Sequence, residues 1–348
     1  MNFKATALNR IVTSSVAAAA VVLSPVFATV AQAQTQSLTG AGASFPALLY
    51  QQYTREVRKT HSDLQVSYTS CGSSCGIRNF INGTVDFGAS DAAMSDADIA
   101  KVSRGTILVP TAGGAVSVIH NIPGVKDLKL SRTTLPLIFG GAITNWNDAR
   151  IKKDNPGVNL PNLAITPVVR ADGSGTTFIF TNHLSTISSY FKGRVGTGQN
   201  PSWRFKSVRK GPGNNGVAAL VKRTRGSVGY VNDSYAFQNK LNSAMVQNSS
   251  GQFVAPSLKA SNEALASVQF PANYRVFVGD SSKGYPIVGL TWMMIYKKYP
   301  TAAKAAAVKK WINWVMTKGQ SLNDDLLFTS IPASVRQRVI NQVNSEVK

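Results

Sequence analysis

The stretch "LAITPVVRADGSGTTFIFTNHL", residues 163–184, predicts a strand, a glycine turn and a helix in direct succession. The strand, at 163–170, is rich in β-branched residues and ends at Arg170. The turn places hydroxyl groups around Gly173 and Gly175, where the first N–H groups of the helix have no partner within it. Such a helix start attracts anions, and a guanidinium fork suits two oxygens of one oxyanion. Asp172 either pairs with Arg170 and holds that fork, or acts only as a turn or cap residue.

Strands and helices alternate along the whole chain. Residues 63–69 and 84–91 alternate as strands do, and each leads into a helix; Ser95 is the expected cap of the second. This alternation predicts an α/β class with mostly parallel sheets. We expect two separate strands at 105–110 and 114–124, and only loops with a weak helix at 241–284. Trp311, Trp314 and Val315 fall at helical spacing and are expected in the core.

Three further strand-to-helix junctions have the same chemistry as the turn after Arg170. They lie at residues 42–45, 72–74 and 89–91 and contain small residues and hydroxyls. Ligands of open α/β sheets bind at the carboxyl ends of the strands, so we expect the junctions to face one site. Each has a plainer reading: Ser44 would cap a helix ahead of Phe45-Pro46, and Asp91 would cap the next helix.

The charge balance is strongly basic. The chain has 37 Lys and Arg against 16 Asp and Glu, a formal charge of +21. A positive field of this size favours anionic partners. The basic residues are scattered singly or in pairs, with no basic arm and no zinc-finger spacing, so we do not expect nucleic-acid binding.

The first 33 residues have the pattern of a cleavable signal peptide. Lys4 and Arg10 precede a short apolar run at 11–27, and Ala31-Gln32-Ala33 matches a cleavage site. The run is too short and too interrupted for a permanent membrane anchor. No cysteine lies near the cleavage site, so no lipid anchor is expected. The mature chain is predicted to be soluble and outside the cytoplasm.

The two cysteines, Cys71 and Cys75, bracket one turn in "SCGSSCG". Their spacing places them within disulfide reach, and an oxidising compartment preserves such a bond. We favour the disulfide over two free thiols. No third or fourth ligand is nearby, so a metal site is not expected. The three histidines, His61, His120 and His183, each stand alone and are expected at the surface or in caps.

Several motifs together resemble one family. They are "LTGAGASFP", "VDFGASDAAMS", "RADGSGTTFIFT", "GPGNNGVAALV", "GSVGYVNDSYA" and "PIVGLTWMMIYK". The mature chain resembles, nearly end to end, the periplasmic phosphate-binding proteins of Pst-type ABC transporters. The resemblance implies the periplasmic-binding-protein (type 2 solute-binding) α/β fold, with two lobes, a two-strand hinge and the ligand cleft between the lobes. Lobe I would comprise 34–112 and 288–348, and lobe II 113–287, with the crossings near 111–114 and 287–289.

The resemblance also implies a set of phosphate ligands. In this sequence they are Ser44, Phe45 through its backbone N–H, Ser73, Asp91, Arg170, Ser174, Gly175 through its backbone N–H, and Thr176, with Asp172 in support. Two features depart from the family pattern. Ser44 replaces the usual threonine but keeps the hydroxyl, and the cysteines around Ser73 are unusual, which makes Ser73 the least secure ligand.

The function that the resemblance implies is capture of phosphate and its delivery to the membrane subunits of an ABC permease. We expect a monomer without a cofactor. An ionised Asp91 would accept the hydrogen that phosphate keeps at neutral pH and would reject sulfate, which has none. Two alternatives remain: a binder of another tetrahedral oxyanion, with arsenate not excluded by Asp91, or a secreted phosphatase with Ser174 as nucleophile. A serine nucleophile needs an adjacent base, and the isolated histidines argue against an enzyme.

Overall fold

The computed structural model describes residues 35–348, which form one compact unit. The signal peptide predicted at 1–33, with its cleavage site, lies outside the described residues. None of the helices within 35–348 combines the length and the apolar character needed to cross a membrane.

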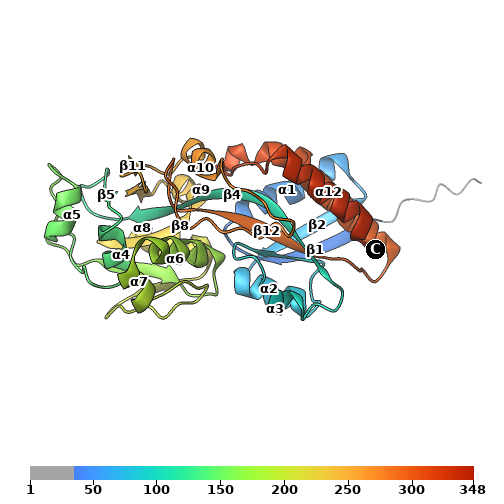
Figure 1. Cartoon of the computed structure of the whole chain (residues 1–348), viewed down its shortest axis with the longest axis horizontal. Helices are drawn as coiled ribbons and strands as arrows, with labels where there is room; N and C mark the ends of the chain where they lie inside the picture. The colour runs from blue at the N-terminus through green and yellow to red at the C-terminus, as the bar shows by residue number, and fades with distance from the viewer. Residues whose placement is uncertain (1–34) are drawn as a thin grey trace, which may run out of the picture. The chain divides into compact units, whose positions relative to one another are not determined.

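A nine-stranded sheet runs through this unit in the order β2-β1-β3-β12-β4-β8-β6-β7, with β9 paired to β4 (Figure 1). In chain order, the elements up to β4 are β1 (Gln36–Gly42), α1 (Ala47–Thr60), β2 (Leu64–Ser70), α2 (Ser73–Ile81), β3 (Phe87–Ser90), α3 (Asp96–Ile99) and β4 (Thr106–His120). Those that follow up to α9 are β5 (Lys129–Leu130), α4 (Thr134–Phe139), α5 (Ala149–Asp154), β6 (Thr166–Arg170), α6 (Gly175–Ile187), α7 (Ser189–Arg194), β7 (Arg209–Gly211), α8 (Gly213–Arg223), β8 (Ser227–Asn232) and α9 (Asp233–Gln238).

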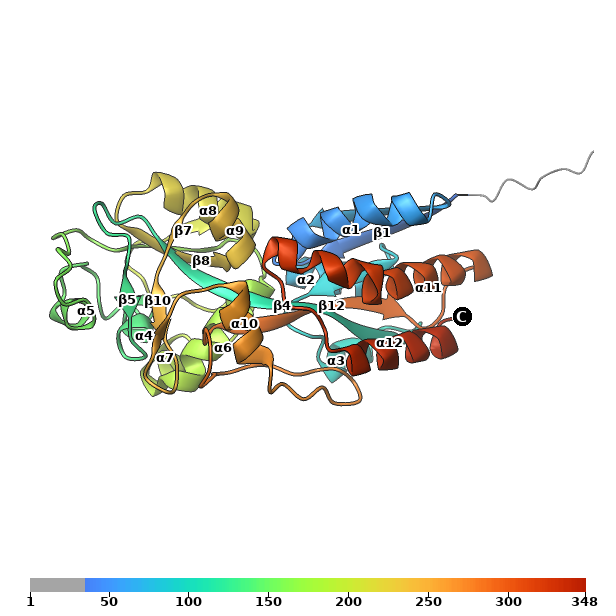
Figure 2. The same cartoon turned by 90° about the horizontal axis from the view of Figure 1, so that it is seen from above.

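The remaining elements lead back toward β1. They are β9 (Asn242–Ser243), β10 (Met245–Gln247), β11 (Phe253–Val254), α10 (Leu258–Leu265), β12 (Val288–Tyr296), α11 (Ala302–Met316), two short 3-10 helices (Lys318–Leu322 and Asp324–Leu326) and α12 (Ala333–Glu346). Strands β10, β11 and β5 form a separate small sheet. Helices α11 and α12 lie side by side near the strands β1 and β12 (Figure 2).

Strand β4 connects two halves of the large sheet. Its residues 106–115 pair antiparallel with β12, and its residues 116–120 pair antiparallel with β8. The first half of the sheet is therefore β2-β1-β3-β12 and the second half is β8-β6-β7, with β4 shared between them (Figure 1). Nearly every residue of β4 and β12 is buried, which explains their long apolar sequences.

The α/β prediction is confirmed, with three corrections. The two strands expected at 105–110 and 114–124 are one continuous strand, because Gly113 and Gly114 remain extended between β12 and a bridge to Thr329. The sheet is mixed, because β4 and β12 run antiparallel to their neighbours, although β1, β2 and β3 are parallel. Residues 241–284 contain three short strands besides the expected helix. These strands were missed because two or three residues are too few to show an alternation of apolar and polar residues.

Aromatic side chains fill the core between α1, α11 and the first half of the sheet. Trp311 and Trp314 stack with ring centroids 5.9 Å apart, and Tyr53 meets both rings edge to face. Both tryptophans and Val315 are buried, as their helical spacing predicts. This packing anchors α1, whose preceding turn carries Ser44 and Phe45.

Candidate functional site

The carboxyl ends of the parallel strands in the two halves of the sheet meet at one place. Ser73, at the start of α2, accepts a hydrogen bond from the N–H of Gly175 in α6 at 3.0 Å. Ser44, in the turn after β1, accepts one from the N–H of Asn214 in α8 at 3.1 Å. Contacts between the two halves thus bring together all four junctions that the sequence singled out. We call the set Ser44, Ser73, Asp91, Arg170, Ser174 and Thr176 the anion cradle.

Ser73 and Ser174 have their hydroxyl oxygens engaged by backbone N–H groups. Ser73 Oγ accepts from the N–H of Asp91 at 3.2 Å as well as from Gly175. Ser174 is the N-cap of α6, and its Oγ accepts from the N–H of Thr177 at 3.0 Å. Both serines are fully buried. A hydroxyl that accepts from N–H groups still has its own hydrogen to donate, which suits an oxyanion.

The hydroxyl oxygens of Ser44 and Thr176 also accept hydrogen bonds from N–H groups, and Asn214 donates to both. Asn214 Nδ2 donates to Ser44 Oγ at 2.8 Å and to Thr176 Oγ1 at 3.1 Å. Thr176 Oγ1 also lies 3.4 Å from Arg170 Nη1. All four hydroxyls of the cradle therefore accept N–H groups and keep a hydrogen for another acceptor.

Arg170 is held by Asp172. Its Nε donates to Asp172 Oδ1 at 2.9 Å, and its Nη2 donates to Asp172 Oδ2. Only 2% of the Arg170 side chain is exposed. Burial raises the pKa of Asp172, but the hydrogen bonds and charge of Arg170 outweigh it and lower that pKa below its ordinary value. The predicted pairing is confirmed: Asp172 holds one edge of the guanidinium, through Nε and Nη2, and Nη1 is directed toward Thr176.

Asp91 is the one carboxylate inside the cradle. Its Oδ1 accepts from Thr291 Oγ1 at 2.8 Å, while no hydrogen-bond partner of Oδ2 is found within residues 35–348. Burial raises the pKa of Asp91 to about 7, against the opposing effects of the Thr291 hydrogen bond, the Arg170 charge and the neighbouring Ser73 hydroxyl. A buried acceptor without a donor is costly, so Oδ2 is suited to a ligand that supplies a hydrogen.

The raised pKa of Asp91 makes the stability of the protein depend on pH. The folded state holds the proton more tightly than the unfolded chain, so this stabilisation is complete below the unfolded pKa near 3.8 and is lost as pH rises to about 7. The loss is on the order of 4 kcal/mol. We expect Asp91→Asn to raise the melting temperature of the ligand-free protein by several degrees at pH 7.5 and by only about a quarter as much at pH 4.5. Asp325→Asn, at an exposed carboxylate, is the control; an equal effect of Asp91→Asn at both pH values would contradict the linkage.

Gly175 and Phe45 were expected to offer backbone N–H groups to the anion. The N–H of Gly175 supports Ser73 in this structure, and a Cβ at this glycine would lie 2.6 Å from Asp91 Oδ2. Only glycine allows α6 to come this close to the cradle. Phe45 is buried, and within residues 35–348 no hydrogen bond of its N–H is found.

The expected helix cap at Ser44 is wrong. Helix α1 begins after Pro46 and has no side-chain cap, because the Ser44 hydroxyl faces Asn214 in the other half of the sheet. Ser95, in contrast, caps α3 as predicted, by accepting from the N–H of Asp98.

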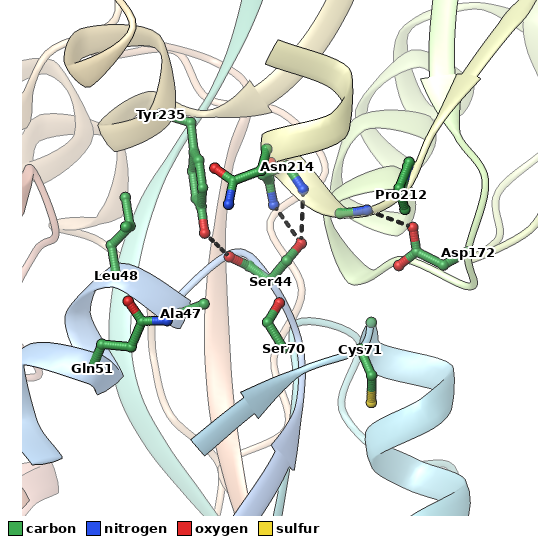
Figure 3. A pocket seen from close by; sticks show the side chains of 13 residues that line it. Ser44, Ala47, Leu48, Gln51, Ser70, Cys71, Asp172, Pro212, Asn214 and Tyr235 are labelled. Carbon is green, nitrogen blue, oxygen red and sulfur yellow. Dashed lines mark hydrogen bonds between the residues drawn. The ribbon is translucent and has the colours of Figure 1, made fainter. Parts of the chain in front are cut away.

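A cavity of about 250 Å³ adjoins the cradle (Figure 3). Its walls include Ser44 and Asn214, together with Asp172, Tyr235 and Gln51. The other cradle residues are not part of its lining and are almost completely buried. The cavity is therefore a neighbouring space that reaches the cradle at Ser44.

The predicted disulfide is present beside the site. Cys71 and Cys75 are bonded, with their Cα atoms 5.8 Å apart, and the closed loop contains Ser73. We expect thiol titration of the unfolded protein to find no free thiol before reduction and two after it.

The disulfide should make a small contribution to stability. A loop this short limits the entropic gain to on the order of 2 kcal/mol. Reduction should therefore lower the melting temperature by about 2–4 °C, and a variant with Cys71→Ser and Cys75→Ser should not respond to the reductant. A wild-type protein indifferent to reductant would show that the bond stabilises nothing.

The histidines differ from expectation. His61 ends α1 as a C-cap, as expected, but His120 and His183 are buried, and burial lowers the pKa of each to about 4. His183 Nδ1 lies 3.0 Å from the carbonyl oxygen of Gly279, away from the cradle. Within the described residues, no group of three His, Cys, Asp or Glu side chains is arranged to hold a metal ion.

Sequence reasoning missed three residues that complete the site. Asn214 and Tyr235 contact Ser44, and Thr291 contacts Asp91. The only sequence signal was "GPGNNG", which reads as one more glycine turn entering a helix. Thr291 lies in the middle of the buried strand β12, where the sequence pattern does not distinguish it from the surrounding core residues.

Comparison with known proteins agrees with this geometry. A family model described as a PBP superfamily domain matches residues 28–318. The phosphate-binding protein PstS of Pasteurella multocida is 37% identical over 338 residues, which cover 94% of this chain and 96% of that protein. The solved structure of a high affinity periplasmic phosphate-binding protein bound with phosphate is similar with a TM-score of 0.72 at 20% identity, covering 88% of this chain and 94% of the other. A phosphate-binding protein from Stenotrophomonas maltophilia gives a TM-score of 0.70 at 22% identity, covering 88% and 93%.

These similarities confirm the predicted fold, an α/β periplasmic-binding-protein fold with two lobes. The family model spans most of the chain, and the relative aligns with it almost end to end. The chain therefore belongs to the PBP superfamily and, within it, to the family of the PstS phosphate-binding proteins.

Proposed function

We propose that this chain is a periplasmic protein that captures inorganic phosphate in the anion cradle and delivers it to the membrane subunits of an ABC permease. The observation that supports phosphate most directly is the composition of the cradle. Four buried hydroxyls keep hydrogens to donate, Arg170 supplies a held cation, and Asp91 Oδ2 supplies one acceptor. A tetrahedral anion that retains one hydrogen matches this set of donors and the single acceptor.

The two-lobed fold suggests how phosphate enters and leaves. We assign lobe I to residues 34–112 and 288–348 and lobe II to 113–287, with β4 and β12 as the hinge. Antiparallel pairing of β4 with β12 and then β8 supports this assignment, because both crossings lie in these strands. Bending there would separate Ser44 and Ser73 from Asn214 and Gly175 and open the cradle.

Asp91 selects phosphate over sulfate, while arsenate, which also keeps a hydrogen, is accepted. The protein acts as a monomer and reaches the periplasm through its signal peptide, without a lipid anchor. It does not hydrolyse phosphate esters, because Ser174 Oγ serves as a helix cap and the buried His183 bonds to Gly279 instead of to a serine.

Calorimetric titration of the refolded, phosphate-stripped protein tests this function. We expect stoichiometric phosphate binding at micromolar affinity or tighter at neutral pH, and far weaker binding of sulfate. Absence of heat with both anions would refute the proposal. Turnover of a chromogenic phosphate ester by the same preparation would refute the statement that the protein is not an enzyme.

A further inference from the structure

The side chain of Asn214 has a fixed orientation. Asn214 is fully buried in the first turn of α8, and its Oδ1 accepts from the backbone N–H of Asn232 at 2.8 Å. A backbone N–H can only donate, so the carbonyl oxygen of the amide must face Asn232. The Nδ2 group must then face Ser44 and Thr176, to which it donates at 2.8 and 3.1 Å.

This orientation determines where two hydroxyl hydrogens can point. Ser44 Oγ accepts from both the N–H and the Nδ2 of Asn214, so its own hydrogen has to find another acceptor. Thr176 Oγ1 accepts from Asn214 and faces Arg170 Nη1, so the hydroxyl hydrogen of Thr176 also has to find another acceptor. Ser73 and Ser174 accept from backbone N–H groups alone. Ser44 and Thr176 share a side-chain donor, the Asn214 amide, which supplements the backbone N–H of Asn214 at Ser44 and Arg170 Nη1 at Thr176.

Asn214 also joins the two halves of the sheet. Ser44 follows β1 in the first half, and Asn214 follows β7 in the second. Tyr235 adds a third bond across the same gap, from its hydroxyl to the Ser44 carbonyl oxygen at 2.7 Å (Figure 3). Ser44 and Asn214 both line the adjoining cavity, so their contact lies between the two halves at the edge of that space.

We propose that Asn214 is a positioning residue for anion binding, which turns the hydroxyl hydrogens of Ser44 and Thr176 toward the anion and fastens the closed lobes through Ser44. This inference rests on the proposed function. It adds to the cradle a residue that acts through its neighbours, without contact to the anion.

A double-mutant cycle for phosphate binding tests the inference. Asn214→Ala and Ser44→Ala are each expected to raise the phosphate dissociation constant by about 10- to 50-fold, the loss of one to two hydrogen bonds. If Asn214 acts through Ser44, the phosphate dissociation constant of the double variant should be little higher than that of whichever single variant binds phosphate more weakly. Asn215→Ala, at the exposed neighbour that lines the cavity, is the matched control and should stay within about twofold of wild type.

A second substitution separates positioning from folding. Asn214→Ala removes the acceptor for the N–H of Asn232, whereas Asn214→Asp retains an oxygen there. A carboxylate has no hydrogen to give, so it would draw the hydrogens of Ser44 and Thr176 away from the anion. We therefore expect Asn214→Asp to melt at or above the temperature of Asn214→Ala but to bind phosphate more weakly.

The outcomes are distinct. The inference would be overturned if Asn214→Ala and Ser44→Ala multiplied each other's effects on the phosphate dissociation constant. It would also be overturned if Asn214→Asp bound phosphate with wild-type affinity. Both results would leave the proposed function intact. Failure of the wild-type protein to bind phosphate would overturn the proposed function and this inference with it.

Discussion

Arg170→Ala should raise the dissociation constant for phosphate by about 10²- to 10⁴-fold, because two charge-assisted hydrogen bonds of about 1.5–3 kcal/mol each are lost. The guanidinium is buried and held by Asp172, so no reorganisation is needed when the anion binds. Its removal also leaves the charge of Asp172 without its partner next to the site, which adds repulsion.

Two further variants make this expectation specific. Arg170→Lys retains the charge but cannot bond to both oxygens of Asp172 and to an anion in one plane, so it should recover only part of the affinity. Arg209→Ala removes an exposed arginine from β7, the strand paired with that of Arg170, and tests the effect of net charge alone. Calorimetric titration at fixed ionic strength measures all three. An affinity of Arg170→Ala within threefold of wild type would show that Arg170 is structural.

Asp91→Asn should weaken phosphate binding modestly and narrow the preference for phosphate over sulfate. An asparagine oxygen can still accept a hydrogen from phosphate, but without charge assistance, and its amide group can donate to sulfate. The variant thus lacks the charged carboxylate, which accepts hydrogen bonds only and therefore disfavours sulfate. Titration with both anions at pH 8 measures the ratio of the two constants. An unchanged ratio would refute the role of Asp91 in recognising the hydrogen.

The pH dependence of sulfate binding gives a second, independent measure of Asp91. The pKa of about 7 means that the carboxyl is ionised above this pH, and sulfate can be accommodated only if Asp91 takes up a proton. The sulfate dissociation constant of the wild type should therefore rise tenfold for each pH unit above 7. Phosphate retains a hydrogen above pH 7, so the phosphate dissociation constant should change little over the same pH range. Asp91→Asn should abolish the sulfate dependence, and a wild-type sulfate constant that is level above pH 7 would contradict this account.

Local chemistry in the sequence was sufficient to find the four junctions from which the cradle residues come. Ser174 is a helix cap, Arg170 pairs with Asp172, and Cys71 with Cys75 form a disulfide; each of these contacts spans four residues or fewer. Propensities, turn chemistry and cap preferences act over this range, so sequence patterns could predict them. The general assignment to an α/β fold followed in the same way from the alternation of strands and helices.

The sequence was less informative where a role depends on a distant partner. Ser44 looked like a helix cap and instead accepts bonds from Asn214, 170 residues further along. Strands 105–110 and 114–124 looked separate because of their glycines, yet pairing with β12 keeps them continuous. His120 and His183 are buried by neighbours that no local pattern reveals.

By itself, the sequence determined the class of fold and the four glycine and hydroxyl turns, and its resemblance to one family predicted an oxyanion site with one carboxylate. Only the tertiary structure decided which groups donate to the cradle hydroxyls, that no residue within 35–348 bonds to Oδ2 of Asp91, that the pKa of Asp91 is raised, and that Asn214 contacts Ser44 across the two halves of the sheet. The physical reason is that residue types state which hydrogen bonds are available, whereas burial and long-range pairing decide which of them are used and which group remains for a ligand.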